Sequence, residues 1–361
     1  MADHPPSPPA KAEQISECLQ ELVANKGGEP PGRYCYKDGV GEVLDTSSLP
    51  LMKIPIIDIG LLASPTSICR EELEKLHSAL SSCGCFMSIN HGMTSSFLDE
   101  VRLATKKFFA LPMEEKQKYA REVDAMEGYG NDMILSEDQV LDWNDRLYLL
   151  ASQKTRDSSD IGQKVLLILG EFITETLFEY TSKLRLITEV VLKAMARSLN
   201  LENNCFLDKY GARAIMQARF NFFPPCSRHH LVLGLKSHSD GSVITIVLQD
   251  KEVEGLQFLK DDQWFRVPII PEALLINIGE QAEILSNGLF KSPIHRVVIN
   301  PERERFSLAV FCSPDPDNEI EPVDGLVSKT RPRQYKKVKN YVGNYFQYYQ
   351  RGKSPIEALK T

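Results

Sequence analysis

The stretch Ser237-His238-Ser239-Asp240-Gly241, together with His295 further along the chain, decides how the second half of the protein folds. On an extended strand, side chains at i and i+2 point to the same face, so His238 and Asp240 can reach one ion. Two histidines and one aspartate are the ligand set of the 2-His-1-carboxylate triad, which binds Fe(II) and leaves coordination positions open. Because His295 must approach from another strand, the pattern requires a compact β scaffold.

Arg305 and Ser307 repeat the i, i+2 spacing shortly after His295. A buried guanidinium beside a hydroxyl suits a carboxylate, because the fixed fork of donors can bind both carboxylate oxygens. The pair therefore predicts an anionic co-substrate next to the metal.

The periodicity of the sequence changes from helix-like to strand-like after Gly211. Eight short segments with alternating apolar residues follow, separated by Pro, Gly, Asp and Asn turns: 214–222, 231–235, 243–249, 255–259, 264–267, 273–278, 294–299 and 305–312. Such a series is typical of a jelly-roll or cupin-like double sheet. We therefore expect an α+β fold with a jelly-roll core and flanking helices.

Helical patterns fill most of the chain before this core, for example over 71–82, 95–109 and 165–199. A further helix is predicted over 341–349, where it would either cover the mouth of the core or seal a sheet edge. We divide the chain into an N-terminal extension (1–52), a mainly helical N-terminal region (53–210), the jelly-roll core (211–315) and a C-terminal helical segment (316–361).

The composition, with 42% apolar and 25% charged residues, is that of an ordinary globular protein. The net charge of −7 offers no excess of cations for nucleic acid or an anionic membrane, so we expect neither partner. The eight cysteines form no Cys-x-x-Cys pair and the N-terminus has no apolar targeting segment, so we expect reduced thiols in a cytoplasmic protein. We expect a monomer that acts on a small molecule.

Large aromatic residues are concentrated between Gly128 and Leu150. Tyr129, Trp143 and Tyr148 can line a substrate mouth there, or can simply pack as large rings. The sequence alone leaves both interpretations open.

Several segments resemble the plant 2-oxoglutarate/Fe(II)-dependent dioxygenases, in particular their codeine-demethylase-like, senescence-related branch. The segments in the second half are Asn221-Phe222-Phe223-Pro224-Pro225-Cys226, 231–235, His238-Ser239-Asp240-Gly241, 254–257, 276–279, 286–288 and Arg305-Phe306-Ser307. In the first half, the likeness covers 54–59, 89–92, 109–120 and 128–150. Nearly the whole chain is included.

The resemblance implies a double-stranded β-helix core with a catalytic iron held by His238, Asp240 and His295. It implies Fe(II) as the metal, 2-oxoglutarate and O2 as co-substrates, and ascorbate as the reductant. The family couples decarboxylation of 2-oxoglutarate to attack on a C–H bond of the substrate, with hydroxylation or O-demethylation as the outcome.

The resemblance also implies that Arg305 and Ser307 bind the distal carboxylate of 2-oxoglutarate and that Asn221 lies nearby. Family members usually carry a tyrosine at the second aromatic position of the Asn-aromatic-aromatic-Pro motif, and its hydroxyl helps to hold 2-oxoglutarate. In this chain the position is Phe223. One hydrogen bond to a charged group, worth about 1.5–3 kcal/mol, is therefore missing, and we expect weaker co-substrate binding.

The substrate side is expected to be aromatic. The resemblance implies that Phe311 faces the substrate, and Phe306, Tyr129 and Trp143 are further candidates. These residues suggest a small apolar, aromatic plant specialised metabolite. The segment 151–170 departs from the Trp-Pro-containing sequence that relatives usually carry beside the pocket. In this segment the resemblance therefore gives the weakest basis for assigning the relatives' substrates to this chain.

Three alternatives remain open from the sequence. A same-fold oxidase that does not use 2-oxoglutarate would bind the substrate's own carboxylate on Arg305 and Ser307, and Phe223 favours this alternative. A non-catalytic small-molecule binding protein with the same fold is opposed by the intact triad. A zinc hydrolase is disfavoured because no general-base glutamate lies at a suitable spacing.

Overall fold

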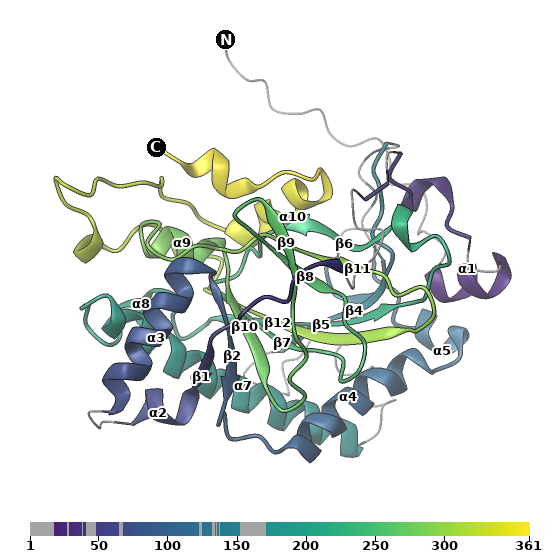
Figure 1. Cartoon of the computed structure of the whole chain (residues 1–361), viewed down its shortest axis with the longest axis horizontal. Helices are drawn as coiled ribbons and strands as arrows, with labels where there is room; N and C mark the ends of the chain where they lie inside the picture. Colours follow the sequence, from purple (N-terminus) through teal and green to yellow (C-terminus); the bar gives the residue numbers. More distant parts are fainter. Residues whose placement is uncertain are drawn as a thin grey trace, which may run out of the picture.

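The computed structural model of the protein describes residues 18–26, 29–37, 39–40, 48–64, 68–122, 125–131, 134, 136, 138–151 and 171–361. In this part of the chain, two sheets form the core (Figure 1). The larger sheet has eight strands in the order β1 (Ile56–Asp58), β2 (Cys85–Ile89), β10 (Leu274–Ile278), β7 (Ile244–Leu248), β12 (Arg305–Ser313), β5 (Ile215–Phe223), β4 (Asp145–Ala151) and β3 (Gly128–Gly130). The smaller sheet has the order β6 (Leu233–His238), β11 (His295–Val298), β8 (Leu256–Lys260) and β9 (Gln263–Arg266).

The predicted α+β fold with a double sheet is confirmed. Each of the eight strand segments predicted after Gly211 overlaps one of the strands β5 to β12, with ends that differ by up to three residues. The pairing between β10 and β7 and the pairing between β12 and β5 are antiparallel, as in a jelly roll.

The side chains of β12 alternate between the two faces of the larger sheet. Its even-numbered residues, such as Leu308 and Val310, belong to the hydrophobic core that includes residues of the helices. Successive side chains of a strand point to opposite faces, so Arg305, Ser307 and Phe311 point to the inner face, toward the smaller sheet.

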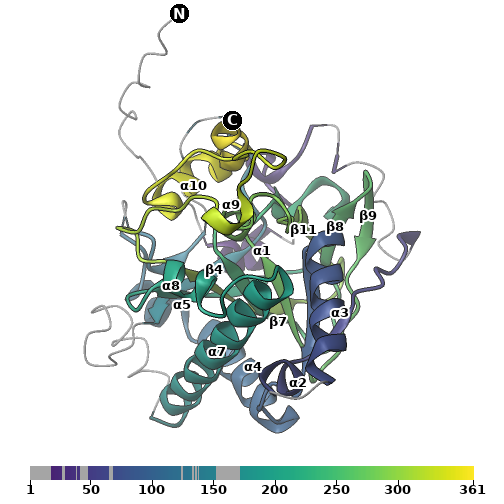
Figure 2. The ribbon, with the colours of Figure 1, turned by 90° about the vertical axis from the view of Figure 1, so that its left-hand side faces the viewer.

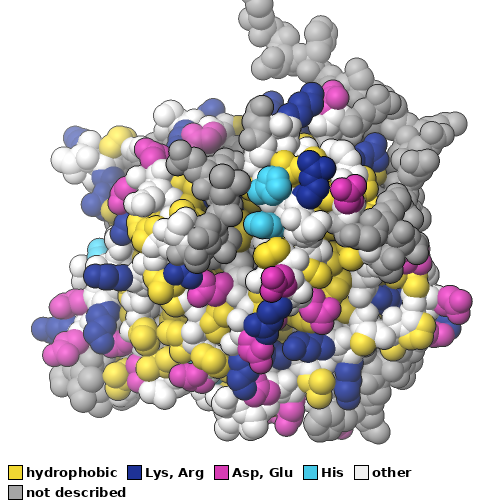
Figure 3. Space-filling model, turned by 45° about the vertical axis from the view of Figure 1, so that its right-hand side comes forward, with side chains coloured by type: hydrophobic (Ala, Val, Ile, Leu, Met, Phe, Trp, Pro, Cys, Tyr) yellow, Lys and Arg dark blue, Asp and Glu magenta, His cyan; other side chains and the backbone are white. Residues whose placement is uncertain are grey.

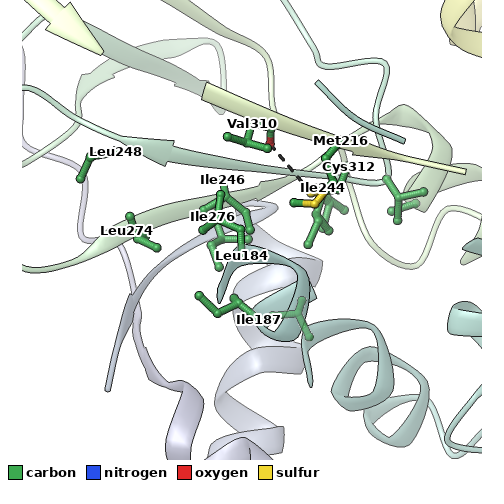
Figure 4. Close-up of a cluster of buried hydrophobic side chains, with 14 of the residues drawn as sticks. Leu184, Ile187, Met216, Ile244, Ile246, Leu248, Leu274, Ile276, Val310 and Cys312 are labelled. Carbon is green, nitrogen blue, oxygen red and sulfur yellow. Dashed lines mark hydrogen bonds between the residues drawn. The ribbon is translucent and has the colours of Figure 1, made fainter. Parts of the chain in front are cut away.

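Three helices cover the outer face of the larger sheet: α3 (Ile68–Ser82), α4 (Ser95–Phe109) and α7 (Glu171–Ser198) (Figure 2). Figure 4 shows Leu184 and Ile187 of α7 against Ile244, Ile246 and Ile276 of the sheet. All five side chains are buried, and each contributes about 1.5–3 kcal/mol through removal of its apolar surface from water. This packing gives the inner face of the sheet a rigid support.

The remaining described helices are short. They are α1 (Leu19–Lys26), α2 (Ile59–Ala63), α5 (Met113–Gln117), α8 (Cys205–Tyr210), α9 (Glu280–Leu285) and α10 (Tyr341–Gln350), with 3-10 turns at Gly32–Tyr34, His229–Leu231, Asp324–Leu326 and Pro355–Leu359. The helices predicted over 71–82, 95–109 and 341–349 are confirmed. The helical pattern predicted from Val165 is observed from Glu171 onward, and residues 152–170, which carry most of the divergent segment, lie outside the described residues.

Strands from the first half of the chain join the core sheet. Both β2 and β4 precede residue 211, yet β2 pairs with β10 and β4 pairs with β5. The helical region and the jelly-roll core therefore share one sheet, and the division of the chain at residue 211 stays a prediction.

Two surface features bear on possible partners. Within the part of the chain that the structure describes, no helix combines the length and apolarity needed to cross a bilayer. Figure 3 shows acidic and basic side chains interspersed over one face of the molecule.

Candidate active site

His238, Asp240 and His295 lie together between the two sheets. Strands β6 and β11 are antiparallel neighbours, and their register places His295 opposite His238. The Nε2 atom of each histidine lies 3.6 Å from Oδ1 of Asp240. The ligand atoms of all three residues lie within 4.8 Å of one another, so the side chains that the sequence predicted to converge do so.

The backbone fixes the tautomer of both histidines. Nδ1 of His238 lies 2.7 Å from the carbonyl oxygen of Lys236, and Nδ1 of His295 lies 3.1 Å from the carbonyl oxygen of Pro293. Because a carbonyl only accepts, each Nδ1 donates its hydrogen, and the lone pair of Nε2 stays available on the side of Asp240. This is the arrangement that metal-binding histidines use.

The Asp240 carboxylate is oriented by Asn277 of β10. Nδ2 of Asn277 donates to Oδ2 of Asp240 at 2.8 Å, which leaves Oδ1 facing the two histidines. Burial alone would raise the pKa of Asp240, but His295 and His238 more than offset it and hold that pKa below its usual range. Burial, with His238 nearby, lowers the pKa of His295 to about 4. At neutral pH the group therefore offers a carboxylate and a neutral imidazole.

The donor set fits iron. Two imidazole nitrogens and one carboxylate oxygen, all deprotonated at their ligating atoms, match the facial triad that holds Fe(II) and leaves coordination positions open. The sequence prediction of a 2-His-1-carboxylate group thus agrees with the geometry.

A glycine at the end of β10 lets the loop that carries Asp240 come close. A Cβ on Gly279 would lie 2.1 Å from the carbonyl oxygen of Ser242 and 2.8 Å from that of Asp240. The next residue, Glu280, donates its backbone N–H to the same Asp240 carbonyl at 2.7 Å. Sequence reasoning gave no role to Asn277 or Gly279, although an amide within the apolar strand Leu274–Ile278 was an available signal.

A second group of polar side chains lies further along the inner face, where β12 pairs with β5. Arg305 is opposite Phe223 in this register, and Ser307 is opposite Asn221. Nε of Arg305 donates to the carbonyl oxygen of Val253 at 3.2 Å, while its Nη1 is buried without a partner. Burial lowers the pKa of Arg305 to about 10, so the guanidinium remains charged at neutral pH.

The neighbours of Arg305 complete a carboxylate-binding set. Nδ2 of Asn221 donates to Oγ of Ser307 at 3.3 Å, so the hydroxyl hydrogen of Ser307 is free to bond another acceptor. The ring of Phe223 lies 5.2 Å from the Arg305 guanidinium and supplies no hydroxyl. Arg305 and Ser307 therefore offer donors that suit the carboxylate of 2-oxoglutarate.

Helix α10 closes the side of the metal group that faces away from the sheets. The hydroxyl of Tyr345 donates to the carbonyl oxygen of Ser239 at 2.6 Å, and that of Tyr349 donates to Oδ2 of Asp142 at 2.5 Å. The hydroxyl of Tyr341 donates to Glu280. The helix predicted over 341–349 therefore covers the mouth of the core and does not merely seal a sheet edge.

A cavity of about 30 Å³ remains beside the metal group. Its lining includes His238 and Asp240, and its aromatic walls are Tyr148, Phe311, Tyr345, Phe346 and Tyr349. A space of this size holds about one water molecule, so an aromatic substrate requires side chains of α10 to move aside.

The four candidate substrate residues separate into two groups. Phe311 lines the cavity and stacks on Tyr148, with ring centroids 6.3 Å apart. Phe306 lies on the opposite face of β12, where its ring packs on Phe109 and Phe222. The parity that points Phe311 inward points Phe306 toward the helices, so the expectation that Phe306 lines the pocket does not fit the structure.

Tyr129 and Trp143 are also core residues outside the cavity lining. Tyr129 packs on Phe108, and its hydroxyl hydrogen-bonds with Sγ of Cys18 at 2.6 Å. Trp143 packs edge-on against Tyr34, and its Nε1 donates to the carbonyl oxygen of Pro224 at 3.1 Å. Simple packing is therefore the correct interpretation for these two rings, and Tyr148 alone of the three central aromatics lines the cavity.

Comparison with known protein families identifies both halves of the chain. The model of the 2OG-Fe(II) oxygenase superfamily matches residues 213–314. The model of the non-haem dioxygenase in morphine synthesis N-terminal region matches residues 54–165.

Individual relatives extend this likeness over most of the chain. Codeine O-demethylase of Papaver somniferum is 36% identical over 88% of this chain and 88% of its own length. Oxoglutarate-dependent flavonoid 7-O-demethylase 1 of Ocimum basilicum is 33% identical over 95% of this chain and 90% of its own length. A crystal structure of JOX2 in complex with 2OG, Fe and JA has a TM-score of 0.82 and 28% identity, over 96% of this chain and 98% of that one. With the iron-binding geometry and these similarities taken together, the chain belongs to the 2OG-Fe(II) oxygenase superfamily.

Proposed function

We propose that this 2-oxoglutarate- and Fe(II)-dependent oxygenase hydroxylates or O-demethylates a small plant metabolite with an apolar, aromatic body. The observation that carries the proposal is the opening of an aromatic-lined cavity directly onto His238 and Asp240. Several relatives support it, since codeine, thebaine and flavonoid O-demethylases are each at least 33% identical to this chain. The comparisons do not support the alternatives of a 2-oxoglutarate-independent oxidase or a binding protein.

His238, Asp240 and His295 would hold the iron through Nε2, Oδ1 and Nε2. Bound Fe(II) with 2-oxoglutarate and O2 supplies an oxidant strong enough to break a C–H bond, with succinate and CO2 as by-products, and ascorbate keeps the iron reduced. The task of the protein is to orient the reactants and exclude water.

Different side chains bind 2-oxoglutarate and orient the substrate. Arg305 and Ser307 bind the distal carboxylate of 2-oxoglutarate, and Asn221 directs the Ser307 hydroxyl. Phe223 closes the same site without a hydrogen bond. Phe311 and Tyr148 orient the substrate ring, and the carbon that lies next to the metal is the one oxidised.

Loss of a ligand tests the proposal. We expect His238→Ala and Asp240→Ala to abolish 2-oxoglutarate-dependent succinate formation, since two remaining ligands cannot keep the iron in place. His229→Ala is the matched control, because His229 lies in the 3-10 turn His229–Leu231 and outside the ligand group, and its activity should equal that of the wild type. Unchanged turnover in the two ligand variants would disprove the assignment.

We also propose that the protein acts as a monomer in the cytoplasm and without nucleic acid. The interspersed surface charge and the net charge of −7 support the last point. Light scattering of the purified chain and imaging of a fluorescent fusion test the first two.

A further inference from the structure

The cavity beside the metal group contains a buried cation that no described residue neutralises. Arg219 of β5 lines this cavity together with His238 and Asp240. Its side chain belongs to a residue only 8% exposed, and two of its guanidinium nitrogens, Nε and Nη2, have no hydrogen-bond partner. Among the described residues, no carboxylate forms an ion pair with it.

An unpaired buried charge is costly, because the group loses its hydration and gains nothing in return. Asp240 also lines this cavity, but its carboxylate already accepts a hydrogen bond from Asn277 and faces the two histidines. Within the described residues no carboxylate is therefore left to compensate Arg219, and an anion bound in the cavity can do so.

Arg219 and Arg305 lie too far apart along the sheet to bind the same carboxylate. In the register of β5 with β12, Arg305 is opposite Phe223, whereas Arg219 is opposite Ala309. Four residues along a strand correspond to about 13–14 Å. The distal carboxylate of 2-oxoglutarate, once bound at Arg305 and Ser307, leaves Arg219 without a partner.

The residues around Arg219 indicate the chemical character of the rest of the ligand. Tyr148 lies directly opposite Arg219 on β4, and Phe311 and Phe346 complete an apolar wall. The hydroxyl of Ser313, also without a partner, adds one further polar atom at the cavity. An occupant that satisfies this lining has an apolar ring system and one anionic end.

We propose that Arg219 binds a carboxylate of the substrate, so that the enzyme oxidises an aromatic or alicyclic carboxylic acid held by that group. The proposal rests on the function proposed above and narrows its substrate class. A guanidinium–carboxylate pair is bidentate and directional, so it would fix which carbon of the substrate lies next to the iron.

The test compares acids with their methyl esters at equilibrium, without turnover. The full chain is loaded with Fe(II) and saturating 2-oxoglutarate under nitrogen, so that no probe acid competes for Arg305. Isothermal titration calorimetry then measures the dissociation constants of a panel of acid–ester pairs, including cinnamate and methyl cinnamate, phenylpropionate and its methyl ester, and cyclohexylacetate and its methyl ester.

We expect at least one acid to bind the wild type about tenfold or more tightly than its ester, and Arg219→Gln to remove that preference. The variant should weaken acid binding by about 10- to 100-fold, as expected for loss of a charge-assisted pair, and change ester binding less than twofold. Arg219→Lys keeps the charge and should restore part of the preference. Arg219→Leu serves as a second neutral variant if Arg219→Gln does not fold, as judged by its thermal transition.

Two results would overturn the proposal: no acid of the panel exceeding its ester in the wild type, or Arg219→Gln weakening acid and ester equally. The affinity for 2-oxoglutarate is measured in parallel and should be the same in the wild type and the variant. Failure of the wild type to bind 2-oxoglutarate would contradict the function proposed for the whole site, and is thereby distinguished from failure of the Arg219 assignment.

Discussion

His238 and His295 face each other across the ladder between β6 and β11, with ring centroids 4.3 Å apart and both Nε2 atoms 3.6 Å from the same oxygen of Asp240. Both rings are held by backbone carbonyls on their other side. The ligand atoms are therefore positioned by the sheet itself, and variants that disturb their supports should weaken metal binding.

Asn277 is the first of these supports. Replacing it with Ala removes the hydrogen bond to Oδ2 of Asp240 and frees the carboxylate to rotate. We expect Fe(II) affinity to fall about 10- to 100-fold, the usual effect of losing a group that orients a metal ligand. The iron concentration dependence of succinate formation measures this effect. Asn203→Ala, in an exposed loop, is the control, and equal iron affinities in the two variants would show that Asn277 does not position Asp240.

Gly279 is the second support, and it acts through the absence of a side chain. Gly279→Ala would place a methyl group 2.1 Å from the carbonyl oxygen of Ser242, so the loop that carries Asp240 must shift. We expect the free energy of unfolding to fall by about 1–3 kcal/mol and iron binding to weaken. Gly32→Ala is the matched control, because nothing lies within 4 Å of a Cβ there. Denaturant unfolding of both variants decides the matter, and equal stability would contradict the close approach.

Phe223 offers a gain-of-affinity prediction. A hydroxyl added by Phe223→Tyr would extend from a ring that lies 5.2 Å from the Arg305 guanidinium, in the site assigned to 2-oxoglutarate. We expect the KM for 2-oxoglutarate to fall about tenfold, as for one added hydrogen bond to a charged group. Phe222→Tyr is the control, because Phe222 points to the helices and its hydroxyl would lie in the apolar core. An unchanged KM in Phe223→Tyr would mean that the missing hydroxyl has no role here.

The features that could be predicted from the sequence depend on short-range spacing. The i, i+2 pairs His238/Asp240 and Arg305/Ser307 directly encode which side chains share a face of a strand, because the period of a strand is two. The same parity also separates Phe311, which lies an even number of residues after Arg305, from Phe306. Applying the rule along the whole strand would have excluded Phe306 from the pocket.

The features that could not be predicted depend on contacts between distant segments. Tyr349 reaches Asp142, and Asp142 accepts the backbone N–H of Lys236 at 2.8 Å. No periodicity links these positions, since the contact exists only once α10 has docked on the core. Arg219 carried no distinguishing signal either, because its lack of a partner is a property of the folded cavity.

His91 gives a prediction for acid stability. Its Nε2 lies 3.0 Å from the carbonyl oxygen of Glu272, and its Nδ1 accepts the backbone N–H of Met93 at 3.3 Å, so the folded protein requires a neutral imidazole. Burial lowers the pKa of His91 below 6.5. Between that lowered pKa and 6.5 the unfolded chain binds more protons than the folded one, so stability falls as the pH falls through this window.

We therefore expect His91→Gln to lose less stability than the wild type when the pH is lowered from 7 to 5. Urea unfolding of the metal-free protein at both pH values measures the difference. His230→Gln, which replaces a histidine of the 3-10 turn His229–Leu231, serves as the control and should keep the wild-type slope. A wild-type slope in His91→Gln would rule out a neutral, buried His91 as a source of acid sensitivity.

Tyr349 connects the closing helix to the metal group, because its ring packs edge-on against His238 with centroids 5.0 Å apart and its hydroxyl bonds Asp142. Tyr349→Phe keeps the ring but removes a hydrogen bond to a carboxylate, which is worth about 1.5–3 kcal/mol. Since α10 must move for an aromatic substrate to enter, a weaker closure should expose the site to water and raise the amount of 2-oxoglutarate consumed per substrate oxidised. Tyr348→Phe, on the exposed side of the same helix, should keep the wild-type ratio. The ratio of succinate to oxidised product is the measurement, and an unchanged ratio in Tyr349→Phe would mean that this hydroxyl does not control closure.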